Sequence, residues 1–148
     1  IQAQILELLI ELKHRLGLAV LLISHDLGLV AGIADRVAVM YGGRIVEQSS
    51  TADIFARPRH PYTEGLLRAI PRVDRAQATL ASIPGSVPPA TAWPGGCRFH
   101  PRCRYAWDRC GSQEPALLGE EGSHTARCWL IEEPGRRSMS PVGAERAP

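Results

Sequence analysis

Four cysteines stand in the second half of the chain, at Cys97, Cys103, Cys110 and Cys128, in the pattern C-x5-C-x6-C-x17-C. Four thiols in so short a span favour ligation or disulfide bonding over chance. No basic stretch followed by an apolar stretch and a small-residue cleavage site marks the chain for secretion, so we expect a cytosolic protein. Disulfides are disfavoured in that compartment, which favours metal or cluster ligation.

The spacing of the cysteines bears on what they hold. Zinc sites normally take ligands in close C-x2-C pairs, and this chain has no such pair. Four thiolates can instead hold a 4Fe-4S cluster, for which ligand spacing varies more between families. His100 and His124 lie among the cysteines and could substitute as ligands or lie at the surface. The spacing favours a cluster but leaves zinc, and four unligated buried thiols, as alternatives.

His25 is the second candidate, because it directly follows the unbroken apolar run from Leu18 to Ile23. Such a run is typical of a strand covered on both faces of a parallel sheet. Ligands of open α/β sheets bind at the carboxyl ends of these strands. A neutral imidazole there can donate a hydrogen bond to a phosphate oxygen or hold an attacking water. The alternative is a histidine that only caps the next helix.

The elements that position these residues follow from periodicity and turn signals. Apolar residues at helical spacing predict a well-buried helix over residues 1–16, ended by Gly17. Asp26 is suited to cap a helix ending near Asp35, and Gly42-Gly43 to join strands 37–41 and 44–48 in a hairpin. Short helices are expected over residues 51–57, opened by a capping box, and over residues 64–69. The preceding His60-Pro61-Tyr62-Thr63 is interpreted as a packing motif.

Composition divides the chain into four parts. None of the twelve prolines precedes Pro58, and all cysteines and tryptophans fall between Trp93 and Trp129. We expect an α/β portion over residues 1–57, a helix and Pro/Gly-rich linker over 58–95, a four-cysteine extension over 96–131 and a disordered tail over 132–148. The longest apolar run is shorter than the roughly 20 residues of a spanning helix. A formal charge of +2 gives no reason to expect a nucleic-acid partner.

Several segments together carry a family resemblance. Leu22-Ile23-Ser24-His25-Asp26-Leu27 and the stretch from Asp35 to Glu47 resemble the switch-histidine segment and the following strand pair of ABC transporter ATPases. The segments 60–67, 83–85 and 96–103 resemble the C-terminal extension of ATPase subunits from oligopeptide and dipeptide importers, a family that includes nickel importers. Arg104 departs from the proline expected there, and residues 88–93 differ from the usual linker.

This resemblance implies a role for each candidate. The fold would be the C-terminal portion of a P-loop ABC-type ATPase domain followed by an irregular cysteine-rich extension. His25 would contact the γ-phosphate of ATP, bound with Mg²⁺, between two ATPase subunits. Cys97, Cys103, Cys110 and Cys128 would hold a 4Fe-4S cluster with a structural or regulatory role.

The resemblance also implies partners and a location. The partners would be a second ATPase subunit, transmembrane permease subunits and, indirectly, an extracytoplasmic solute-binding protein, with the ATPase peripheral at the cytoplasmic face of the bacterial membrane. The chain opens in mid-pattern at Ile1 and carries no phosphate loop, signature loop or Walker B acidic motif, so we expect a truncated chain that does not hydrolyse ATP alone. The alternative is a free-standing zinc-binding interaction module without catalytic activity.

Overall fold

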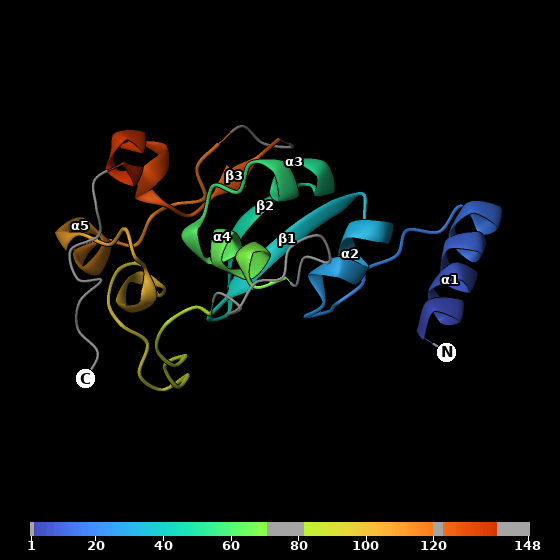
Figure 1. The fold of residues 1–148 in the computed structure, drawn as a ribbon, viewed down its shortest axis with the longest axis horizontal. Coiled ribbons are helices and arrows are strands. Elements are labelled where there is room, and N and C mark those ends of the chain that lie inside the picture. Colours follow the sequence, from blue (N-terminus) through green and yellow to red (C-terminus); the bar gives the residue numbers. More distant parts are fainter. Residues whose placement is uncertain (1, 71–81, 120–122, 139–148) are drawn as a thin grey trace, which may run out of the picture.

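The computed structural model describes residues 2–70, 82–119 and 123–138. Parts of the predicted linker, extension and tail, at residues 71–81, 120–122 and 139–148, lie outside the described residues. The described part is elongated, with α1 at one end and the cysteine-bearing loops at the other (Figure 1). The elements are α1 Gln2–Leu16, α2 Leu27–Ile33, β1 Arg36–Tyr41, β2 Arg44–Ser50, α3 Thr51–Ala56, α4 Pro61–Arg68, α5 Asp108–Ser112, β3 Thr125–Ala126 and the 3₁₀ helices η1 His100–Arg102, η2 Trp129–Ile131 and η3 Pro134–Arg137.

The predicted hairpin is confirmed. β1 and β2 pair antiparallel, with Arg36 opposite Ser50 and Tyr41 opposite Arg44. Gly42 and Gly43 form the turn with φ of 57° and 75°, a backbone region that disfavours other residues at both positions of a two-residue turn. The described residues combine helices with one small antiparallel sheet. The predicted α/β class is therefore confirmed only in the sense that both kinds of element are present.

A third strand, which the sequence did not predict, completes the sheet in the order β1-β2-β3. β3 pairs antiparallel with β2, placing Ala126 opposite Glu47. The next residue, Arg127, donates its backbone N–H to the Val46 carbonyl at 2.8 Å. The cysteine-bearing region is therefore joined to the hairpin by backbone pairing.

Side-chain caps begin three of the helices. The Asp26 carboxylate accepts the Leu29 N–H at 3.1 Å, and the Ser50 hydroxyl accepts the Asp53 N–H at 3.1 Å, so both predicted caps are confirmed. α4 begins at Pro61, earlier than predicted, because His60 is its N-cap. Proline suits the first turn of a helix, since its missing N–H would have no partner there.

The core is shared between the hairpin and the segments that follow it. Val39, Tyr41, Val46 and Phe99 are buried together. Side chains from α4, from residue 83 and from the first two cysteines pack against them. Ordered structure also continues to Ser138 through η3, further than the sequence predicted. The division into four segments stays a prediction, although the hairpin and the cysteine loops share one core.

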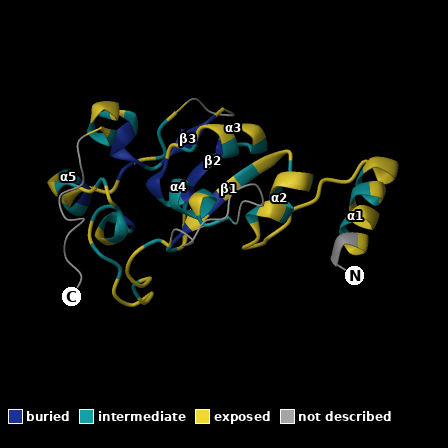
Figure 2. Ribbon diagram, viewed as in Figure 1, coloured by how far each residue is buried: buried dark blue, intermediate teal, exposed yellow. Residues whose placement is uncertain are grey.

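The first part of the chain differs from its prediction. Residues 18–23 form no strand, and Leu21 and Ile23 are each 90 % exposed. α1 has the predicted length but exposes Leu8 by 54 % and Leu16 by 64 %, so it is not well buried (Figure 2). The physical reason is that no strand or helix among the described residues covers these apolar side chains. No helix in the described part is both long and apolar enough to cross a membrane.

Candidate functional site

All four cysteines line one cavity, although they come from four different places in the fold. Cys97 precedes η1, Cys103 directly follows it, Cys110 lies in α5, and Cys128 lies between β3 and η2. All four are free thiols, with Cys110 and Cys128 buried. A hydrogen bond of 2.8 Å from the Cys97 N–H to the Cys110 carbonyl ties the first loop to α5. The structure thus brings together the residues that the sequence singled out.

Backbone groups near the four cysteines favour their thiolate forms. The backbone of Phe99 lowers the pKa of Cys97, and that of Tyr105 lowers the pKa of Cys103. The backbone of Leu130 acts in the same way on the pKa of Cys128, and that of Trp107 on the pKa of Cys110. Hydrogen bonding to a thiolate has this effect because it stabilises the charged form.

The thiols are nevertheless neutral in the protein alone. Burial raises the pKa of Cys103 and of Cys128 to about 12, and the neighbouring cysteines add to this while the backbone donors oppose it. Burial likewise raises the pKa of Cys97 and of Cys110. Such buried thiols ionise when they ligate a positively charged group, which releases their protons.

The remaining wall of the cavity is aromatic, apolar or histidine. Apart from the cysteines, the residues that line it are His60, Pro61, Phe99, His100, Tyr105, Trp107, Trp129 and Leu130. None of them carries a permanent charge. Within the described residues, however, no three His, Cys, Asp or Glu side chains are arranged to hold a single metal ion. The thiols therefore share a cavity without converging on one point.

The cavity wall contains two histidines, for which the sequence led to different predictions. His100 was a possible substitute ligand, and it lines the cavity. His60 was assigned to packing, yet it also lines the cavity and is 1 % exposed. Burial, and secondarily the charge of Arg137, lowers the pKa of His60 to about 3, so its ring is neutral. The signal that pointed to it was the His-Pro-Tyr-Thr motif. The ring of Tyr62 in this motif packs on the ring of Tyr41, with the ring centroids 4.8 Å apart, as the packing interpretation predicts.

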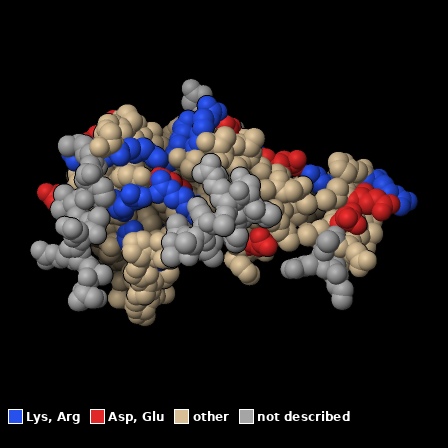
Figure 3. Space-filling model, viewed as in Figure 1, with Lys and Arg blue, Asp and Glu red and all other residues tan. Residues whose placement is uncertain are grey.

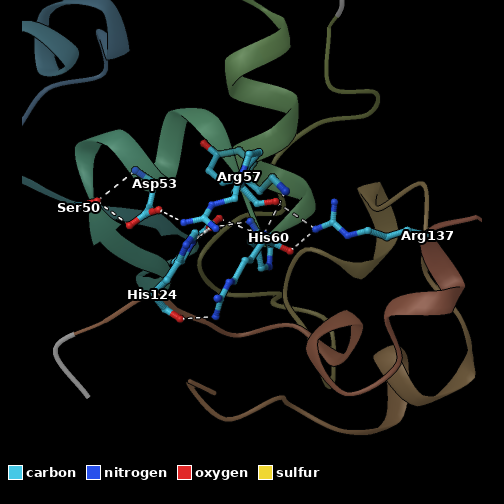
Figure 4. A network of polar contacts seen from close by, with 10 residues as sticks. Ser50, Asp53, Arg57, His60, His124 and Arg137 are labelled. Carbon is cyan, nitrogen blue, oxygen red and sulfur yellow. Dashed lines mark hydrogen bonds and ion pairs between the residues drawn. The ribbon is translucent and has the colours of Figure 1, made fainter. Parts of the chain in front are cut away.

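A buried carboxylate holds the loop before α4 against the sheet. Glu47 of β2 is fully buried and accepts the backbone N–H groups of Arg59 at 2.6 Å and of His60 at 2.9 Å. The Nε2 atom of His124 lies 2.6 Å from the same carboxylate. His124, the other possible substitute ligand, is thus engaged with Glu47 and is not among the residues lining the cavity. Figure 4 shows His124 in the same polar network as His60.

The end of the described chain closes over the same region. The Arg137 guanidinium lies 3.2 Å from the Glu64 carboxylate of α4 and donates to the Arg59 carbonyl at 2.5 Å. The Tyr105 hydroxyl also donates to Glu64, at 3.0 Å. η3 is therefore fastened to the start of α4 and to the loop that carries Cys103.

Arginines stack on all three tryptophans. Arg109 lies 3.6 Å from the Trp129 ring, and two similar pairs are Arg136 with Trp107 and Arg98 with Trp93. Figure 3 shows Lys and Arg side chains gathered over this end of the molecule, whereas the α1 end carries both signs. These arginines cover aromatic faces, an arrangement that stabilises each pair by about 0.5–2 kcal/mol.

His25 lies apart from the cysteines. It is an exposed residue in the turn between residues 18–23 and α2, next to the Asp26 cap. The Ser24 hydroxyl accepts the Asp26 N–H at 3.0 Å, which shapes this turn. α2 and α5 lie towards opposite ends of the molecule in Figure 1. The two predicted sites are therefore separate.

Comparison with known proteins defines the class. Residues 46–110, which span β2 to α5, match the family described as oligopeptide/dipeptide transporter, C-terminal region. This match confirms the resemblance to the C-terminal extension of peptide importer ATPase subunits that was drawn from the sequence.

Individual relatives make the match more specific. The oligopeptide transport ATP-binding protein AppD of Bacillus subtilis is 50 % identical over 91 % of this chain and 41 % of its own length. The dipeptide transport ATP-binding protein DppD of Escherichia coli is 46 % identical over 94 % of this chain and 43 % of its own length. A putative peptide import ATP-binding protein of Brucella abortus is 49 % identical over 86 % of this chain and 38 % of its own length. The chain thus spans about two fifths of the curated relatives it matches.

Proposed function

We propose that this chain is the C-terminal part of an ATPase subunit that powers ABC-type import of oligopeptides or dipeptides. The proposal rests on the sequence identity to two ATP-binding proteins that are named for these substrates. The identity is 46–50 % over more than nine tenths of the chain. In the intact protein ATP would bind with Mg²⁺ between this subunit and a second ATPase subunit. Permease subunits would anchor both at the cytoplasmic face of the membrane, with a solute-binding protein acting on the other side.

The exposed apolar surface at one end supports the same proposal. α1 and residues 18–23 present leucine, valine and isoleucine side chains that no described element covers. We propose that the preceding part of the ATPase domain packs on this surface and pairs with residues 18–23 as a buried strand. Residues 1–57 would then belong to the nucleotide-binding domain, and His25 would stand at the carboxyl end of that strand.

His25 is proposed to contact the γ-phosphate of ATP. Its side chain is exposed, so it is free to meet a ligand from another subunit. In the full-length protein we expect His25→Ala to lower ATP turnover about a hundredfold, the usual cost of removing one polar contact to a transition state. Nucleotide affinity should change far less. His14→Ala, which removes another exposed histidine, is the control. Normal turnover in the His25→Ala protein would contradict the assignment.

We propose that Cys97, Cys103, Cys110 and Cys128 hold a 4Fe-4S cluster. The donor set supports this, because four thiols line one cavity and nearby backbone groups favour the thiolate form of each. A 4Fe-4S cluster takes one thiolate on each iron, and four thiols around one cavity are the ligand set it requires. When bound, the cluster would supply a cross-link among the segments that carry the four cysteines, and we assign it no redox step. Nothing described here supports the alternative of a free-standing zinc module.

The test is the composition of full-length protein purified without oxygen. We expect a brown protein with about four irons and four sulfides. Cys103→Ser should abolish the colour, whereas Ser112→Ala, an exposed serine of α5, should keep it. Colourless wild-type protein with one zinc would overturn the cluster and leave the assignment to peptide import standing.

A further inference from the structure

His60 is the one buried histidine in the wall of the cysteine cavity. It is 1 % exposed and lies beside all four cysteines around the same space. Phe99 packs against its ring, with the ring centroids 5.6 Å apart. Its backbone N–H donates a hydrogen bond to the Glu47 carboxylate at 2.9 Å, so its main chain is fixed as well as its ring.

The hydrogen bonds of His60 fix which ring nitrogen carries the proton. Nδ1 accepts the backbone N–H of Tyr62 at 3.1 Å, as the N-cap of α4. A nitrogen that accepts a hydrogen bond has no proton of its own, so in the neutral ring the proton is on Nε2. Because His60 lines the cavity, this Nε2–H is available to an acceptor held there.

The other histidine of the wall has the opposite arrangement. His100 Nδ1 lies 2.9 Å from the Cys97 carbonyl oxygen, which can only accept, so Nδ1 carries the proton. Its Nε2 is left with a lone pair and has no proton to donate. Of the two rings on this cavity, only that of His60 presents a hydrogen-bond donor.

We propose that His60 Nε2–H donates a hydrogen bond to a sulfur atom of the cluster held by the four cysteines. The inference rests on the cluster proposed above and deepens it. His60 is then a positioning residue that acts on the cluster through its sulfur, in addition to the four backbone donors. It also gives the His-Pro-Tyr-Thr motif a chemical role. Pro61 begins α4, and the hydrogen bond from the Tyr62 N–H fixes the orientation of the His60 ring.

A hydrogen bond to cluster sulfur has a measurable signature. It withdraws electron density from the sulfur and makes the cluster easier to reduce. It also couples the unpaired electron of the reduced cluster to the donor nitrogen. Both effects can be followed by electron paramagnetic resonance on the full-length protein, and neither depends on ATP turnover.

Two substitutions separate the functions of the two ring nitrogens. His60→Asn places an amide oxygen near the position of Nδ1, so it keeps the helix cap and loses the donor. His60→Gln places an amide nitrogen near the position of Nε2, so it keeps the donor and loses the cap. We expect the midpoint potential of the cluster to become more negative in His60→Asn and to stay near the wild-type value in His60→Gln, with iron content unchanged.

A second measurement needs no variant. Wild-type protein labelled with ¹⁵N-histidine is reduced by γ-irradiation at cryogenic temperature, and a nitrogen coupling is sought by pulsed resonance. A histidine coupling that is lost in His60→Asn supports the proposal. A reduced cluster without such a coupling, or equal potentials in wild type and His60→Asn, overturns it while the cluster assignment stands. Wild-type protein without iron and sulfide overturns both, and is recognised before any variant is made.

Discussion

At the scale of single residues, Glu47 links three segments that are distant in the sequence. Its carboxylate joins β2 to the backbone before α4 and to His124 next to β3. A fully buried carboxylate is tolerated only when its oxygens are occupied by donors, and here three donors supply this. Removing the charge would leave backbone N–H groups facing an amide.

We therefore predict that Glu47→Gln destabilises the protein by about 1–3 kcal/mol, the usual cost of leaving a buried polar group without its hydrogen-bond partner. The amide nitrogen of glutamine must face either an N–H group or His124. Urea unfolding followed by tryptophan fluorescence measures this, since all three tryptophans lie between residues 93 and 129. Glu114→Gln is the control, because Glu114 forms an exposed pair with Arg44 that is worth about 1 kcal/mol or less. Equal losses in the two variants would contradict the prediction.

Sequence reasoning reached some of these residues and missed others for a physical reason. The caps Asp26 and Ser50 act on backbone groups three residues away, so local pattern reveals them. The partners of Glu47 come from the loop before α4, 12 and 13 residues away, and from His124, which directly precedes β3 and is 77 residues away. When the distant partners are unknown, a glutamate in a predicted strand is expected to be exposed. For the same reason the sequence does not distinguish His124 from a surface histidine.

At the scale of elements, the close approach of the first cysteine loop to α5 depends on Gly96. Its φ of 63° and the hydrogen bond from Cys97 to the Cys110 carbonyl bring two backbones together. A Cβ at Gly96 would lie 2.8 Å from the carbonyl carbon of Gly111 and closer still to the Cys110 carbonyl oxygen. Backbone, unlike a flexible side chain, cannot move aside without separating the two cysteines.

Gly96→Ala should consequently lower the free energy of unfolding by more than backbone conformation alone explains. Gly17→Ala is the matched control, because Gly17 has the same φ of 63° but nothing within 4 Å of its added Cβ. The control should cost about 1–2 kcal/mol at most, the strain of a left-handed residue. Chemical denaturation of both variants gives the comparison. If Gly96→Ala costs no more than Gly17→Ala, the packing of this loop against α5 is looser than described.

At the scale of the whole molecule, the sequence predicted α1 to α4 and the hairpin, but not α5, the 3₁₀ helices or how these elements are joined. The hairpin is encoded locally by Gly42-Gly43 between two apolar runs, so it was found. β3 is only two residues long and has no pattern of its own. The prediction of a buried strand at residues 18–23 is not met, for the opposite reason. Its apolar pattern is strong, but no described strand lies beside it to pair with. The sequence grouped the four cysteines, which share one cavity, whereas the presence of His60 in the same cavity wall required the fold.

The pairing of β3 with β2 also has a consequence for the order of events during synthesis. The two strands lie in one sheet although Gln48 and Thr125 are far apart in the chain, and contacts of such long range form slowly. On the ribosome, the hairpin emerges well before its third strand. Until β3 arrives, the outer edge of β2 presents unpaired N–H and C=O groups to other nascent chains, and an open edge of this kind promotes aggregation. During translation of residues 51 to 126, the β2 residues that later pair with β3 are therefore open to pairing with another chain.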